Sequence, residues 1–190
     1  MNKIIVVLAT VMTFGLAACA QNKGEKRMQT ENRPLVVYFS ATGTTAKAAR
    51  TIADVTGGAL YEIVPQQTYT SDDLDWNDRQ SRSSVEMNDV KARPTLKETD
   101  ADLAAYDVIY IGYPIWWNQA PRIINTFIES YDLKGKTLVP FATSGGSGIT
   151  GSVKELENTY PDLNWQEGKL LNGTSRNAIQ NWVGDIMKKQ

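Results

Sequence analysis

Residues 35–45 read Leu-Val-Val-Tyr-Phe-Ser-Ala-Thr-Gly-Thr-Thr, and this stretch decides the fold class. Its first five residues form a continuous apolar run, typical of a strand that is covered on both faces of a sheet. Its second part is rich in hydroxyl groups, and a stripe of apolar residues at helical spacing follows it. A buried strand, a polar turn and a helix in this order indicate an α/β fold with a parallel sheet.

The same alternation of short apolar runs and helical patterns continues along the chain. Five strands are expected, at 35–39, 60–64, 108–113, 137–142 and, less clearly, 165–171. Four apolar stripes predict helices, and they begin at Ala48, Ile123, Val153 and Ile179. These helices are sufficient to cover both faces, so residues 34–190 are expected to form one doubly wound domain.

The segment 65–102 breaks this rhythm, because it has few aliphatic residues and carries nine acids against five bases. A helix over 71–88 is expected there, with Ser71 as its N-cap and with Asp72 and Asp73 in the first turn, where they favour the helix dipole. The segment either covers an edge of the sheet or shapes one wall of a site. Of these roles we expect the first.

The composition excludes several classes of function. The 190 residues include no His and a single Cys, so zinc sites, Ser-His-Asp or Cys-His catalysis and intramolecular disulfides lack their usual residues. A formal charge of −1 provides no basic field for nucleic acid. We therefore expect no catalytic side chain, no metal and chemistry that comes from a bound cofactor.

The first 18 residues are typical of a signal peptide, because a basic start is followed by 13 apolar residues, too few to span a bilayer. Leu16-Ala17-Ala18-Cys19 resembles the lipobox of bacterial lipoproteins, which implies lipidation of Cys19. Residues 19–33 would then be a polar tether, and the protein an exported, membrane-anchored lipoprotein that faces the periplasm or the cell exterior. The alternative is an ordinary signal peptide that leaves a soluble protein.

The first loop with functional potential joins the first strand to the first helix. It consists of Ser40, Ala41, Thr42, Gly43, Thr44 and Thr45. Ligands of open α/β sheets bind outside the carboxyl ends of the strands, and hydroxyls at a helix N-terminus can bind a phosphate without a cation. The loop does not match the Lys-containing phosphate loop of nucleotide hydrolases. The alternative is a Ser/Thr-rich helix cap.

The second loop follows the third strand and consists of Pro114, Ile115, Trp116, Trp117 and Asn118. Two adjacent Trp residues are costly to expose, and a flat aromatic ligand would give them a stacking partner. The alternative is that both rings fill the core. Because adjacent residues point in different directions, one ring is free to contact a ligand while the other packs inside.

The third loop follows the fourth strand and consists of Thr143, Ser144, Gly145, Gly146, Ser147 and Gly148. Its glycines permit close backbone approach to a ligand. Residues 146–151 also spell Gly-x-Gly-x-x-Gly, the dinucleotide fingerprint. We discount this match, because the fingerprint belongs to a first strand–helix turn and needs an acid at the end of the next strand.

Taken together, the three loops resemble those of the flavodoxin family, and more closely those of flavodoxin-like bacterial proteins with a Tyr-Pro-x-Trp-Trp loop. The family motif Ser/Thr-x-Thr-Gly-x-Thr, which binds the phosphate of FMN, is matched by Ser40, Thr42, Gly43 and Thr45. The resemblance implies that 114–118 and 143–148 hold the isoalloxazine ring. It also implies a flavodoxin-like doubly wound five-stranded parallel sheet of order 2-1-3-4-5.

Two departures from the family pattern affect the expected function. Residues 143–148 lack the aromatic that many flavodoxins place there, and removal of the signal peptide leaves a charge of only −2. We expect an FMN-binding, membrane-tethered electron-transfer protein that meets a redox partner protein or a small electron acceptor. The alternatives are an FMN-dependent NAD(P)H:quinone-type oxidoreductase, favoured by an open ring face, and a non-redox binding module on the same fold.

Overall fold

The computed structural model describes residues 33–188. The predictions for the signal peptide, for Cys19 and for nearly all of the tether lie outside the described residues. Within residues 33–188, no helix is both long enough and apolar enough to cross a membrane.

The centre of the fold is a sheet in which all strand pairs are parallel and the order is β2-β1-β3-β4-β5, with β6 also pairing with β4. This confirms the predicted α/β class and strand order. The side chains of β1 are buried throughout, as predicted for a strand covered on both faces. The strands are β1 (Leu35–Tyr38), β2 (Ala59–Glu62), β3 (Val108–Pro114), β4 (Thr137–Thr143), β5 (Asn164–Trp165) and β6 (Lys169–Leu170).

The fifth strand position differs from the prediction, because two short strands replace one continuous strand over 165–171. Leu138 of β4 pairs with Trp165, and Phe141 pairs with Lys169, so the outer strand has one more residue than β4 between these pairs. Such an extra residue is a bulge that interrupts the ladder. Gly168 lies in it, and a side chain there would collide with Val153 of the neighbouring helix.

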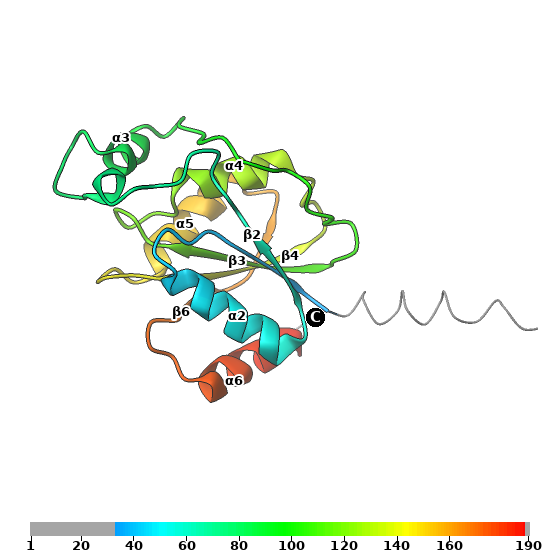
Figure 1. Ribbon diagram of the computed structural model, residues 1–190. Helices are drawn as coiled ribbons and strands as arrows, with labels where there is room; N and C mark the ends of the chain where they lie inside the picture. The colour runs from blue at the N-terminus through cyan, green and yellow to red at the C-terminus, as the bar shows by residue number, and fades with distance from the viewer. Residues whose placement is uncertain (1–32, 189–190) are drawn as a thin grey trace, which may run out of the picture.

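The helices α2, α4, α5 and α6 cover the two faces of the sheet, as predicted (Figure 1). Helices α2 and α6 lie on one face and pack on Val36, Tyr110 and Phe141. Helices α4 and α5 lie on the other face and pack on Val37, Ile109 and Ile111. The helices are α2 (Thr44–Thr56), α4 (Arg122–Ser130), α5 (Thr150–Thr159) and α6 (Arg176–Met187).

The expected continuous helix over 71–88 is wrong. The structure has a 3-10 turn, η1 (Asp72–Leu74), and a separate helix, α3 (Arg82–Asn88), whose N-cap is Ser81 rather than Ser71. The carboxylates of Asp75 and Asp78 accept hydrogen bonds from the N–H groups two residues on, at 2.9 and 2.8 Å. These local bonds compete with helical ones and form turns between the two pieces.

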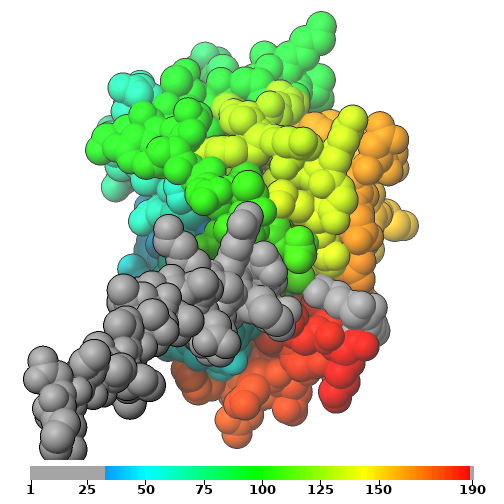
Figure 2. Space-filling view, turned by 90° about the vertical axis from the view of Figure 1, so that its right-hand side faces the viewer, coloured from blue at the N-terminus to red at the C-terminus, as the bar shows by residue number. Residues whose placement is uncertain are grey.

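The segment 65–102 lies on the side of α4 and away from α6, as Figures 1 and 2 both show. It partly serves the expected edge role, because Lys97 N–H donates to the carbonyl of Val64 just after the edge strand β2 (2.8 Å). Its other part, η1 and α3, extends toward the carboxyl ends of the strands. There it forms one wall of a site, which is the second role that the sequence left open.

Candidate functional site

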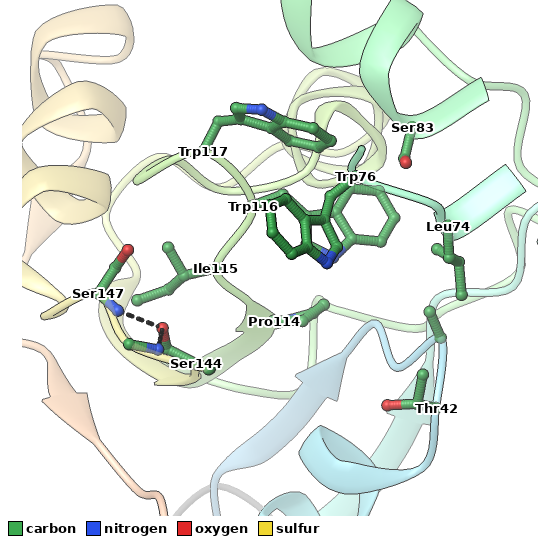
Figure 3. Close-up of a pocket in the computed structure, with 13 residues that line it drawn as sticks. Thr42, Leu74, Trp76, Ser83, Pro114, Ile115, Trp116, Trp117, Ser144 and Ser147 are labelled. Atoms are coloured by element: carbon green, nitrogen blue, oxygen red, sulfur yellow. Dashed lines mark hydrogen bonds between the residues drawn. The ribbon is translucent and has the colours of Figure 1, made fainter. Parts of the chain in front are cut away.

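The three predicted loops meet at the carboxyl ends of β1, β3 and β4, around a cavity of about 660 Å³. None of the thirteen residues that line it carries a charge. In Figure 3 three tryptophans gather on one side of the cavity, and Thr42 lies on the other. The lining residues are Ala41, Thr42, Leu74, Trp76, Ser83, Pro114, Ile115, Trp116, Trp117, Ser144, Gly145, Gly146 and Ser147.

The first loop presents the N-terminus of α2 to this cavity. Gly43 is the N-cap in the left-handed conformation, with φ of 84°, and no side chain caps the helix at that position. The N–H groups of Thr44 and Thr45 belong to the first turn, so they have no acceptor within the helix. Together with the exposed Thr42 hydroxyl they form a neutral set of donors, to which the helix dipole adds a partial positive charge.

Two residues of this loop serve the structure of the loop itself. The Ser40 hydroxyl accepts a hydrogen bond from Ala46 N–H at 3.2 Å, so the capping alternative holds for this residue. Thr45 is buried, and its hydroxyl lies 2.8 Å from that of Thr143. This contact ties the first loop to the third.

The second loop is a tight turn in which Trp116 and Gln119 exchange backbone hydrogen bonds of 3.0 and 2.9 Å. Its central residues, Trp117 and Asn118, have φ of 45° and 62°, and within residues 33–188 they are the only non-glycine residues with positive φ. Asn tolerates this conformation, but a Trp in it is strained. With this backbone conformation the Trp117 ring lines the cavity, and 45% of the residue is exposed.

Trp116 packs inward, although it also lines the cavity. Its ring meets Phe39 and Tyr69 edge to face, with centroids 5.7 and 5.3 Å apart. The core-packing alternative is therefore correct in part for Trp116, whereas Trp117 has no ring neighbour among the described residues. Burial and a hydrogen bond to Glu86 raise the pKa of Tyr69, so its phenol stays neutral beneath the site.

The third loop is held by hydrogen bonds on both sides. The Ser144 hydroxyl accepts from the N–H groups of Gly146 (3.1 Å) and Ser147 (2.7 Å), as Figure 3 shows. The side chain of Asn172 bonds to both the N–H and the carbonyl of Ser144. The amides of this loop are thereby fixed in place beside the cavity.

The Gly-x-Gly-x-x-Gly sequence follows β4 rather than the first strand of the sheet. Its last residue, Gly151, lies in the first turn of α5 against the side chain of Asn118, and a Cβ there would collide with the Asn118 amide. Gly151 therefore has a packing role, because it allows the tryptophan turn to approach α5 closely.

Ten of the seventeen predicted site residues line the cavity, and the other seven are not among its lining residues. The seven that do not line it are Ser40, Gly43, Thr44, Thr45, Asn118, Thr143 and Gly148.

Sequence reasoning missed four residues of this region. Leu74, Trp76 and Ser83 come from the segment 65–102, and Asn172 follows β6. A Trp in a strongly acidic segment was a signal for Trp76, since exposed Trp is uncommon in such stretches. No comparable signal marked Ser83 or Asn172.

Within residues 33–188, no cluster of His, Cys, Asp and Glu could hold a metal ion.

Comparison with known proteins agrees with this geometry. The flavodoxin family model matches residues 33–186. A candidate flavoprotein from Bacteroides uniformis is 58% identical, with a TM-score of 0.79, over 81% of this chain and 99% of its own. A candidate flavoprotein from Bacteroides eggerthii is 61% identical, with the same TM-score, over 82% and 98%.

A more distant structure shares the fold. The flavoprotein from Lactobacillus acidophilus, solved in complex with FMN, is 22% identical over 73% of this chain and 93% of its own, with a TM-score of 0.61. A search of curated proteins gives no match. The match over residues 33–186, together with the sheet order and the three loops, shows that the chain belongs to the flavodoxin family.

Proposed function

We propose that the cavity binds FMN and that the protein transfers electrons through it. The observation that carries this proposal is the meeting of two unlike surfaces in one uncharged cavity. One surface is the neutral donor set of Thr42 and the first turn of α2, which suits a phosphate. The other is aromatic and apolar, which suits a flat ring. The Lactobacillus acidophilus structure supports the assignment, because that protein of the same fold holds FMN.

When bound, FMN supplies the redox chemistry, and the residues of this chain bind and orient it. Thr42 and the amides of Thr44 and Thr45 would hold the phosphate. Trp117, with Trp116 beneath it, would contact the ring, and the loop of residues 144–147 would lie along its polar edge. No side chain needs to act as an acid or a base, which agrees with the absence of His.

The phosphate role of Thr42 predicts a loss of affinity on substitution. Thr42→Val keeps the shape of the side chain and removes its hydroxyl. The free energy of FMN binding should therefore weaken by about 1.5 to 3 kcal/mol, which raises the Kd roughly 10- to 150-fold. Isothermal titration of FMN into the apoprotein measures this change. Thr51→Val is the matched control on the same helix, because its hydroxyl bonds to the carbonyl of Lys47 instead. An unchanged Kd in Thr42→Val would reject the phosphate role.

The two tryptophans of the turn should respond differently to substitution. Trp117→Ala should reduce quenching of the bound flavin's fluorescence with little loss of stability, because Trp117 is exposed and packs on no aromatic ring within residues 33–188. Trp116→Ala should in addition lower the free energy of unfolding by about 2 kcal/mol, since it leaves a hole beside Phe39 and Tyr69. Flavin fluorescence and thermal unfolding measure the two effects. Equal and negligible changes in quenching would show that neither ring contacts the flavin.

We propose further that the protein is exported and anchored by a lipid on Cys19, outside the cytoplasm. The apolar run, the small residues and the Leu-Ala-Ala-Cys sequence support this. Cys19→Ser should move the protein from the membrane fraction to the soluble fraction, because a serine cannot carry the thioether-linked lipid. Ala20→Ser, which keeps the cysteine, is the control and should stay with the membrane. A Cys19→Ser protein that remains in the membrane fraction would contradict the anchor.

A further inference from the structure

One wall of the cavity comes from none of the three loops that carry the family resemblance. It consists of Leu74, Trp76 and Ser83, all from the segment 65–102, and we call it the Trp76 wall. Figure 3 shows the three side chains at the rim of the cavity, on the side away from Ser144 and Ser147. Two of these residues, Ser83 and Trp76, would gain favourable contacts from a bound ligand.

Ser83 is the first of them. It lies in α3 with only 2% of its surface exposed, and its hydroxyl has no hydrogen-bond partner among the described residues. A buried hydroxyl without a partner is unfavourable, and native structures leave few of them. Since Ser83 also lines the cavity, a ligand with a carbonyl oxygen could accept a hydrogen bond from it.

Trp76 is the second. It is 73% exposed, which is the largest exposure among the large apolar residues that the structure describes. It packs on no other aromatic ring within residues 33–188. An exposed indole at the rim of a cavity is suited to stack on a planar molecule that enters it.

The charges beside Trp76 restrict what that molecule can be. Asp72, Asp73, Asp75 and Asp78 flank it in the sequence. The nearby bases are Arg79 and Arg82, and Arg82 forms an ion pair with Glu86 (2.7 Å). Hydrogen bonds from Thr70 lower the pKa of Asp73, so this carboxylate stays charged. A concentration of negative charge on the chain segment that carries Trp76 repels anions, including dinucleotide phosphates, and leaves uncharged molecules unaffected.

We propose that the Trp76 wall binds an uncharged planar carbonyl compound of the quinone class, which stacks on Trp76 and accepts a hydrogen bond from Ser83. This proposal deepens the proposed function and rests on it, because it names the class of small molecule that meets the flavin site. In this proposal the segment 65–102 selects that molecule, and the three loops bind FMN.

The test uses the purified full chain and two probes in equilibrium dialysis, with and without FMN. The probes are menadione, which is uncharged, and 1,4-naphthoquinone-2-sulfonate, which has a similar ring system and a negative charge. We expect menadione to bind more tightly than the sulfonate, and the difference should shrink as salt is added, because salt screens the carboxylates.

Substitutions connect the binding to the wall. Trp76→Ala should weaken menadione binding about tenfold, and Ser83→Ala about fivefold. Val85→Ala, an exposed position on α3 outside the cavity lining, is the matched control and should have no effect. The Kd for FMN should be unchanged in all three. Ser83→Ala should not lower the melting temperature, because the hydroxyl that it removes has no partner within residues 33–188.

Three other outcomes would overturn either the proposed wall or the proposed function. Unchanged menadione binding in Trp76→Ala and Ser83→Ala would reject the wall as a binding site. A loss of FMN affinity in these variants as large as that in Thr42→Val would assign the wall to the flavin instead. Wild-type protein that takes up no FMN would reject the proposed function, while its menadione binding without FMN still reports on the wall separately.

Discussion

Replacing Gly112 with alanine is expected to lower the free energy of unfolding by about 3 kcal/mol, because the new methyl group would overlap a buried ring. Gly112 lies in β3, and a Cβ built on it falls within 3.0 Å of three carbons of Phe141 on the neighbouring strand β4. Phe141 is fully buried, so its ring cannot move aside into solvent. The two strands lead directly into the tryptophan turn and the third loop, so the overlap should also weaken FMN binding.

Chemical denaturation of Gly112→Ala measures the change, and Gly184→Ala is the control. Gly184 lies inside α6, and a Cβ there meets nothing within 4 Å. The same substitution should therefore stabilise the protein at that site, by up to about 1 kcal/mol, since alanine favours the helix. A Gly112→Ala protein as stable as the wild type would show that Phe141 has room which the structure does not give it.

Arg122→Met is expected to cost about 3 kcal/mol of unfolding free energy, because Arg122 joins three segments around the site. Its guanidinium is almost completely buried and donates to the side chain of Gln119 (2.8 Å), to the carbonyl of Met87 (3.2 Å) and to Glu155 (3.3 Å). These partners belong to the tryptophan turn, α3 and α5. Methionine would leave all three acceptors without their donor, and the Met87 carbonyl belongs to a buried residue.

A double-mutant cycle separates the ion pair from the other contacts. Glu155 is 26% exposed at its side chain, so Glu155→Gln alone should cost only about 1 kcal/mol. The double variant Arg122→Met, Glu155→Gln should be more stable than the sum of the two changes predicts, because the unpaired carboxylate is gone. Urea denaturation of the four proteins measures this coupling. An Arg122→Met protein within about 0.5 kcal/mol of the wild type would contradict the linking role.

The sequence predicted the sheet well because the pattern of its strands is strong. The runs at 35–39, 108–113 and 137–142 are nearly all apolar, and few other structures accommodate such runs in a polar chain. The weakest prediction, at 165–171, was also the least accurate. There the alternation is broken by Gln166, Glu167 and Gly168, and the bulge occurs at these residues.

The segment 65–102 could not be predicted from its sequence, because its structure depends on local side-chain bonds. Ser71 followed by Asp72 and Asp73 is a good helix start, but Asp75 and Asp78 end it by bonding to nearby N–H groups. Its packing role is also hidden, since Trp76 and Ser83 reach the cavity only when η1 and α3 fold over the ends of the strands.

The loops of the site were found because Gly, Ser, Thr and Trp each have specific chemical uses after a strand. The sequence could not show which of these residues face the cavity. Thr42 faces it, whereas Thr45 turns inward to Thr143, and the difference depends on the left-handed Gly43 between them. Likewise, Trp117 is exposed at the cavity and Trp116 packs inward only because of the unusual backbone of the turn.

The central claim is that this cavity holds FMN, and an absorption spectrum tests it most directly. The spectrum of the purified chain is recorded as isolated, after addition of FMN and removal of the excess, and after stoichiometric dithionite. The account predicts a flavin band that stays with the protein and is bleached by the reductant, and a lower retention in Thr42→Val. A protein that takes up no flavin, while its fold is intact by circular dichroism, would contradict the account.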